Sequence, residues 1–153
     1  MSGRPEPFDI LPMRERHLTA AAALERVCFG DPWSRDAFLE ELHNPAAHFL
    51  VAERGGELAG YAGMSHVLDE GYVFNIAVAP PFRRQGAARA LLSALDRFAR
   101  EKRLAFLSLE VRVSNSAAIA LYRSCGFQPV GVRPGFYAHP PENAYIMTKF
   151  YRP

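Results

Sequence analysis

The segment that most constrains the fold is residues 75–92, with the sequence NIAVAPPFRRQGAARALL. It begins as an apolar strand, is stopped by Pro80 and Pro81, and passes through a basic stretch with Gly86 into an amphipathic helix. The first N–H groups of such a helix have no acceptor within the helix and carry the positive end of its dipole. A strand, a glycine-bearing turn and a helix start therefore predict an anion site, and a nucleotide-like ligand is the first hypothesis.

Length and composition are those of an ordinary globular protein. The 153 residues are 49% hydrophobic and 22% charged, which is enough apolar material for one substantial core. We expect residues 1–7, rich in Pro, Gly and charge, to be a flexible tail and residues 8–153 to form a single domain. The net charge of +2 is too small to indicate nucleic-acid binding, although arginines are frequent in and before the helix after Gly86.

Cysteine and histidine usage narrows the cellular setting. Cys28 and Cys125 do not form a disulfide framework, and no apolar run resembles a signal peptide or a membrane span. A cytoplasmic location fits best, and no membrane partner is expected. The histidines are scattered and no Cys-x-x-Cys pair is present, so we also expect no metal site.

Hydrophobic periodicity predicts four helices and seven strands. The helices are expected at about 15–29, 34–44, 86–102 and 115–125, and the strands at 8–11, 48–53, 57–67, 72–78, 105–113, 127–132 and 144–151. Ser34 is a predicted helix cap, and Gly126 a predicted helix stop. The Pro- and Gly-rich stretch 134–141 is expected to be a loop. This mixed order predicts an α/β (mixed α+β) sandwich around one sheet.

Polar residues of chemical interest surround the strand 105–113. Strand alternation puts Glu110 on the face opposite the apolar residues. Glu110 lies about 10 Å from the strand's end at ~3.3 Å per residue, and Tyr122 about 10 Å into the next helix at ~1.5 Å per residue. A helix that folds back along the strand would bring them level, with Asn115 on the same stripe as Tyr122. Taken separately, they could also be a solvated glutamate, a core tyrosine and a helix cap.

The glycine-bearing turn can be compared with better-known phosphate loops. The dinucleotide fingerprint needs three glycines, and the P-loop needs Lys followed by Ser or Thr, and neither pattern is present. The turn has Arg83-x-x-Gly86-x-Ala88, where the small residues let a backbone approach phosphate closely. This spacing resembles the pyrophosphate-binding motif of the GCN5-related N-acetyltransferases (GNAT), which bind acetyl-CoA.

A second block makes the resemblance more specific. It reads LEVRxSNxxAxxLYxxxGF from Leu109 to Phe127, and it accompanies FNIAV at residues 74–78. With PWS at 32–34, RPGFY at 133–137 and ENAYIM at 142–147, the chain resembles the RimI-type ribosomal-protein-alanine N-acetyltransferases from Phe8 onward. The resemblance implies the GNAT fold, a central mixed, mostly antiparallel seven-stranded sheet flanked by four helices.

The resemblance also implies roles for individual residues. Glu110 would accept a proton from the attacking amine and Tyr122 would donate one to the leaving thiolate, while a backbone N–H near Ala77 or Val78 would hold the oxyanion. Asn115 would bind the pantetheine arm. The remaining acetyl-CoA contacts would come from Ile76, Ala77, Val78, Arg83, Arg84, Gln85, Gly86, Ala87, Ala88 and Arg89.

The acceptor side departs from the family pattern. Phe136-Tyr137 stands where two tyrosines are common, and Glu142-Asn143 where an acidic pair is common. Trp33, Phe136, Tyr137 and Glu142 are the candidate acceptor-binding residues. Trp33 and Tyr137 could line a peptide site, or could simply pack the corner between the first two helices onto the C-terminal hairpin.

These observations predict an acyltransferase that uses acetyl-CoA as co-substrate. The expected acceptor is the N-terminal α-amine of a protein, a ribosomal protein beginning with Ala, by direct attack in a ternary complex. Two alternatives remain open: acetylation of a lysine or a small-molecule amine, and a non-catalytic acyl-CoA-binding interaction subunit. No direct nucleic-acid partner is expected.

Overall fold

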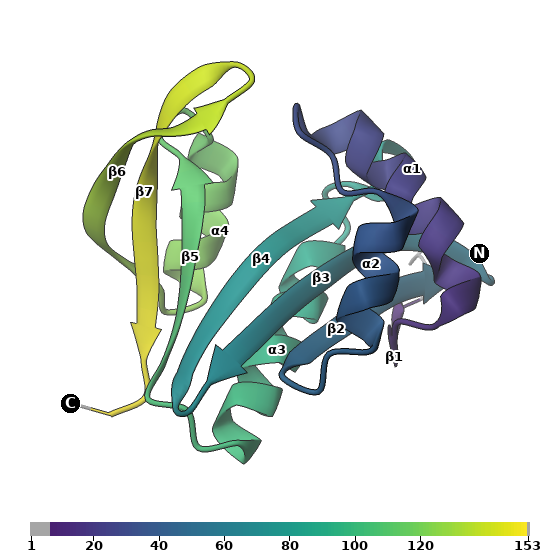
Figure 1. Ribbon diagram of the computed structural model, residues 1–153, viewed down its shortest axis with the longest axis horizontal. Helices are drawn as coiled ribbons and strands as arrows, with labels where there is room; N and C mark the ends of the chain where they lie inside the picture. The colour runs from purple at the N-terminus through teal and green to yellow at the C-terminus, as the bar shows by residue number, and fades with distance from the viewer. Residues whose placement is uncertain (1–6, 153) are drawn as a thin grey trace, which may run out of the picture.

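The computed structural model describes residues 7–152, so the predicted tail lies almost wholly outside the described residues. Seven strands form one sheet in the order β1-β2-β3-β4-β5-β7-β6 (Figure 1). All neighbouring pairs are antiparallel except β4 and β5. The strands are β1 (Asp9–Pro12), β2 (Ala47–Arg54), β3 (Glu57–Val67), β4 (Glu70–Val78), β5 (Phe106–Arg112), β6 (Gln128–Ala138) and β7 (Pro141–Phe150).

Four α-helices cover the two faces of the sheet: α1 (Leu18–Cys28), α2 (Arg35–Leu42), α3 (Ala87–Glu101) and α4 (Ser116–Ser124). In Figure 1, α1 and α2 lie on one face and α3 and α4 on the other. Alternation along β2 explains the two cores, because Leu50 packs in the cluster with α3 while Val51 packs with α1 and α2. The predicted seven-stranded α/β sheet with four helices is confirmed. None of the helices in residues 7–152 is long and apolar enough to cross a bilayer.

The sheet is split at its centre. The parallel pairing of β4 and β5 covers only residues 70–72 against 106–108, and beyond this point no ladder joins them. Figure 1 shows the two strands diverging, with α4 behind the widening gap. Backbone groups on the facing edges of β4 and β5 are therefore left without a strand partner and can bind a ligand instead.

A β-bulge in β4 lies at this opening. The register with β3 shifts between Ala62 and Met64, so Phe74 and Asn75 together oppose Gly63. Gly63 is required because a Cβ there would lie 2.2 Å from the ring of Phe49. Phe74 packs on Trp33 after α1, and Asn75 hydrogen-bonds to Glu25 of α1, so two consecutive side chains face the same layer.

The predicted loop at 134–141 is wrong. β6 continues to Ala138, and only two residues separate it from β7, with an irregularity between Arg133 and Tyr137. β6 is the edge strand, where a proline removes no ladder hydrogen bond if its nitrogen faces outward. The Pro and Gly signals of this stretch mark a bulged strand rather than a loop.

Candidate active site

The start of α3 offers unpaired donors. Gly86 is the cap residue, with φ of +90°, and no side chain caps the helix. A Cβ on Gly86 would meet nothing within 4 Å, so the space above the turn is open. A pocket of about 410 Å³ lies here, and it is lined by Val78, Phe82, Arg83, Arg84, Gly86, Ala87, Ala88, Arg89, Ala117 and Leu121. Open N–H groups and flanking guanidiniums make this pocket suitable for an anion.

The polar side chains of this turn differ in whether they already form hydrogen bonds within the protein. Arg83 donates from Nε to the Val78 carbonyl (3.0 Å), and Arg89 donates from Nη2 to Ser124 Oγ (2.9 Å). Gln85 accepts from Arg54 and donates to the Pro81 carbonyl (3.0 Å). Arg84 is exposed and has no hydrogen-bond or ion-pair partner among the described residues. Arg84 is thus the guanidinium most available to a ligand.

The backbone of β4 presents donors to the split. Ala79 N–H donates to Ala59 O (2.7 Å), and bonded and non-bonded pairs alternate along an antiparallel ladder. Ala77 therefore bonds toward β3, and a Cβ on Gly60 would indeed lie 2.5 Å from the Ala77 carbonyl oxygen. The N–H groups of Ile76 and Val78 consequently point toward the open edge. Of the two oxyanion candidates, Ala77 and Val78, only Val78 has the suitable direction, and it lies at the pocket beside the start of α3.

A second pocket, of about 190 Å³, lies between the diverging strands. Glu110 from β5 and Tyr122 from α4 both line it, as the strand and helix geometry predicts, together with Asn115. Glu110 is partly exposed and forms an ion pair with Arg133 (3.5 Å). Desolvation raises the pKa of Tyr122 to about 12, so its hydroxyl is protonated at neutral pH. A carboxylate and a phenol thus meet in one pocket.

Asn115 has an observed structural task. It caps α4, and its Oδ1 accepts a hydrogen bond from Ala118 N–H (3.2 Å). The helix-cap interpretation of Asn115 is therefore correct as far as its side-chain oxygen is concerned. Its place in the lining of the central pocket leaves the amide nitrogen as the group for a ligand.

A third pocket, of about 450 Å³, shares residues with the central one, including Asn75 and Tyr137. Trp33 lines it and packs against Phe38, Phe49 and Phe74, while Gly30 and Asp31 of the same corner contact His139 of the C-terminal hairpin. Phe136 is half-exposed and packs edge-on against Tyr137. The structure thus brings Trp33 and Tyr137 to one pocket and leaves Phe136 behind Tyr137.

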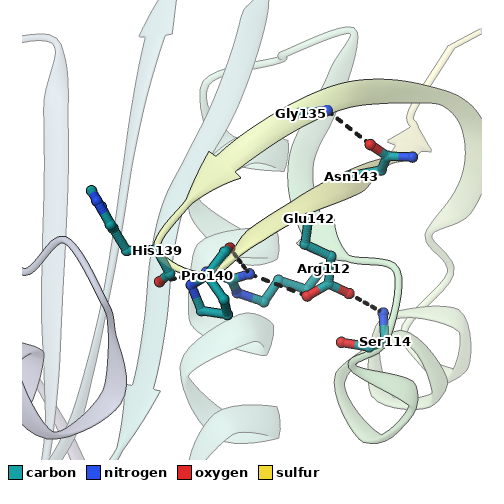
Figure 2. Close-up of polar contacts among 7 residues, drawn as sticks. All are labelled: Arg112, Ser114, Gly135, His139, Pro140, Glu142 and Asn143. Atoms are coloured by element: carbon teal, nitrogen blue, oxygen red, sulfur yellow. Dashed lines mark hydrogen bonds and ion pairs between the residues drawn. The ribbon is translucent and has the colours of Figure 1, made fainter.

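Glu142 lies beside this pocket, but its carboxylate is already engaged. One oxygen accepts from Arg112 (3.1 Å) and the other from Ser114 N–H (2.7 Å) (Figure 2). Hydrogen bonding from Ser114, with the Arg112 guanidinium beside it, lowers the pKa of Glu142. Arg112 also donates to the carbonyls of His139 (3.1 Å) and Pro140 (2.9 Å). Glu142 therefore holds the hairpin tip rather than presenting a free carboxylate.

Glu25 is a site residue that sequence reasoning missed, and the structure places it beneath Trp33 and Asn75 of the third pocket. Its side chain is fully buried, and it accepts hydrogen bonds from Trp33 N–H (2.8 Å), Tyr61 Oη and Asn75 Nδ2 (3.3 Å). The sequence does contain an indication that Glu25 is buried. It falls on the same helical stripe as Leu18, Ala21 and Ala22, which are core residues. A carboxylate on a buried stripe requires partners.

Comparison with known proteins decides the family. The sequence family described as the acetyltransferase (GNAT) family matches residues 18–127. The chain belongs to the GNAT family. The predicted GNAT fold and the acyltransferase class are therefore confirmed.

Named relatives point to one branch of the GNAT family. The chain is 41% identical over 120 residues to the [ribosomal protein bS18]-alanine N-acetyltransferase of Escherichia coli, covering 78% of this chain and 80% of that one. It is 39% identical over 155 residues to the N-alpha-acetyltransferase RimI of Mycobacterium tuberculosis, covering 97% and 96%. The predicted RimI-type kinship is confirmed.

Solved structures agree with this fold. The crystal structure of the E. coli ribosomal-protein-S18-alanine N-acetyltransferase has a TM-score of 0.86 and 36% identity, with 95% of each chain covered. Arabidopsis thaliana NAA60 in complex with acetyl-CoA has a TM-score of 0.86 at 19% identity, with 94% of this chain and 98% of that one covered, which shows a shared fold alone.

Proposed function

We propose that this GNAT protein transfers the acetyl group of acetyl-CoA to the N-terminal α-amine of a protein, a ribosomal protein that begins with alanine. The observation that carries the proposal is the meeting of Glu110 and Tyr122 in one pocket at the split between β4 and β5. The E. coli and M. tuberculosis relatives support the acceptor, since the first is named for alanine of bS18.

The residues at the start of α3 fit the anionic part of acetyl-CoA. The uncapped N–H groups around Gly86 would bind pyrophosphate, and Arg84 would add a guanidinium. The free edge of β4 at Val78, beside the pocket at α3, would bind the pantetheine arm, with the amide nitrogen of Asn115 facing it. Bound acetyl-CoA supplies the thioester carbonyl that an amine can attack.

The chemical step then needs three groups of this chain. Glu110 takes the proton from the attacking amine, directly or through water. Ile76 N–H, which faces the open edge of β4 at the central pocket, stabilises the negative charge that develops on the carbonyl oxygen. Tyr122, which is protonated at neutral pH, donates to the leaving thiolate. Attack within a ternary complex requires no covalent acetyl-enzyme.

An α-amine suits a modest base. At pH 7, roughly a tenth of α-amino groups are neutral, at a reference pKa near 7.7–8.0, against well under a thousandth of lysine side chains. A glutamate that acts through hydrogen bonding is therefore sufficient for an N-terminus. The aromatic lining of the third pocket, with Trp33 and Tyr137, provides walls for a short peptide end.

The test compares acceptors at saturating acetyl-CoA. Short peptides beginning with Ala are expected to be acetylated, and the same peptides with a formylated N-terminus are not. Transfer to polyamines, amino acids or aminoglycosides in preference to every peptide would instead favour a small-molecule acetyltransferase. Binding of acetyl-CoA with no transfer to any amine would favour a non-catalytic subunit.

A further inference from the structure

Asn75 lies where two pockets of the site adjoin. It lies in the β-bulge of β4 and lines both the central pocket and the pocket that holds Trp33. Its amide nitrogen donates to Glu25, whereas its side-chain oxygen has no hydrogen-bond partner among residues 7–152. An amide whose nitrogen is held inside the protein must turn its oxygen the other way, toward the pockets.

Glu25 determines this orientation because it can only accept. Its two oxygens receive three donors from separate parts of the chain: Trp33 N–H, Tyr61 Oη and Asn75 Nδ2. Burial raises the pKa of Glu25, while the three hydrogen bonds that it accepts favour its ionised form, which offers no hydrogen to an amide oxygen. The flipped Asn75 amide would bring two acceptors together, which is unfavourable at a buried site.

The same carboxylate shapes the rest of the pocket. Trp33 follows α1, and its backbone N–H donates to Glu25 Oε1 while its ring packs at tilted angles against Phe38, Phe49 and Phe74. None of the hydrogen-bond partners of Glu25 is a cation. A buried carboxyl group without a cationic partner therefore lies beneath the pocket that would receive an α-ammonium, whose positive charge would favour the ionised form of Glu25.

We infer that the side-chain oxygen of Asn75 accepts a hydrogen bond from the acceptor's α-amine, and that the buried Glu25 carboxylate is the positioning residue that aims it. This inference rests on the proposed function and adds a binding residue and its support to it. It also explains why an amide suits position 75, since an ionised carboxylate only accepts, whereas an amide donates to Glu25 and accepts from an amine through two separate atoms.

The test exchanges the two functional groups. Glu25→Gln introduces an amide that can face the Asn75 nitrogen, and Asn75→Asp places two carboxylates together. Each single substitution is expected to raise the KM for an Ala-initiated peptide about tenfold or more, with acetyl-CoA affinity unchanged. The double variant Glu25→Gln with Asn75→Asp restores one donor at 25 and one outward acceptor at 75, so its KM is expected to return to within about threefold of wild type.

Glu53→Gln is the matched control. It alters another buried carboxylate, whose partners Arg16 and His17 line neither pocket, so it is expected to lower the melting temperature and leave the peptide KM unchanged. The inference would be overturned if Glu25→Gln and Asn75→Asp left the peptide KM unchanged, or if the double variant had a peptide KM as high as that of either single variant. Either result, with normal acetyl transfer by the wild type, would leave the proposed function intact. Wild-type protein that transfers acetyl to no α-amine would overturn both.

Discussion

Glu110 and Tyr122 line one pocket in contrasting surroundings. Glu110 is partly exposed and paired with Arg133, whereas Tyr122 packs at the edge of the core beside Phe127. A base must exchange protons with solvent, and an acid must keep its proton until the leaving group needs it. The two environments match these opposite tasks.

Removing either group is expected to slow turnover without weakening donor binding. Glu110→Gln and Tyr122→Phe keep the shape of the side chains, and each is expected to lower kcat by about 10²-fold. Steady-state kinetics with an Ala-initiated peptide, together with calorimetric titration of acetyl-CoA, measures both quantities. Glu57→Gln, on the exposed turn of the β2–β3 hairpin, is the control. Unchanged kcat in both variants would contradict the assigned roles.

Tyr122 also has a predicted pH signature. Desolvation raises its pKa to about 12, so the folded protein keeps a proton that the unfolded chain loses near pH 10. The stability contribution of this phenol is therefore complete below about pH 10 and is lost as the pH rises toward 12. Urea unfolding across this window should show a steeper fall for wild type than for Tyr122→Phe. Parallel curves would show that Tyr122 is not desolvated.

At the level of elements, the α3 start depends on backbone conformation. Gly86 has φ of +90°, and a non-glycine residue there costs about 1 kcal/mol or more. Gly86→Ala is expected to shift the turn and raise the Kd for acetyl-CoA about fivefold or more. Gly55, with φ of +61° and equally open space, is a matched control at a hairpin turn. Gly55→Ala should lower stability alone, and an equal loss of acetyl-CoA binding in both variants would refute the proposed donor site.

The acceptor pocket depends on contact between two segments. Gly30 follows α1, and a Cβ there would lie 1.9 Å from the His139 carbonyl oxygen at the tip of the β6–β7 hairpin. His139 also pairs with Asp31 (2.8 Å). Gly30→Ala must push the two segments apart, so the peptide KM is expected to rise about tenfold while acetyl-CoA affinity stays the same.

Gly131→Ala provides the comparison for this pocket, because a Cβ there would make an ordinary 3.6 Å contact with Ile146 on the same hairpin. It is expected to leave the peptide KM near the wild-type value. Equal kinetics for Gly30→Ala and wild type would mean that the contact between these segments does not shape the acceptor site.

Elements with strong local signals could be predicted from the sequence. β3 begins and ends at the predicted residues, and Ser34 caps α2 by accepting from Ala37 N–H (3.1 Å), as expected. The first part of β6 matches the strand predicted at 127–132, but its continuation to Ala138 could not be predicted, because Pro and Gly residues there are tolerated only at a sheet edge. The bulge at Phe74 and Asn75 also depends on register with β3, which no local pattern encodes.

The same distinction applies to the site residues. The presence of Glu110 and Tyr122 in one pocket could be predicted from strand and helix spacing alone. Glu142 carried a charge that suggested a substrate contact, but its partners, Arg112 and Ser114 N–H, are 28 or more residues away in sequence. Glu25 was overlooked because its three donors come from three separate segments. Polar networks of this kind require tertiary structure.

At the scale of the whole molecule, the break between β4 and β5 determines where the three pockets lie. The short pairing of β4 with β5 leaves a split with the donor pocket at α3, the central pocket at Glu110 and the acceptor pocket at Trp33. The central and acceptor pockets share Asn75 and Tyr137, so an amine in one can reach the carboxylate in the other. The arrangement suits direct transfer between two bound substrates.

The most direct test locates the acetyl group on the product. A peptide with an N-terminal Ala and one internal Lys is incubated with wild-type protein and acetyl-CoA, and the product is sequenced by tandem mass spectrometry. The acetyl group is expected on the α-amine, with the lysine side chain unmodified. Acetylation of the lysine with a free N-terminus, or no acetylation at all, would contradict N-terminal acetyl transfer by this protein.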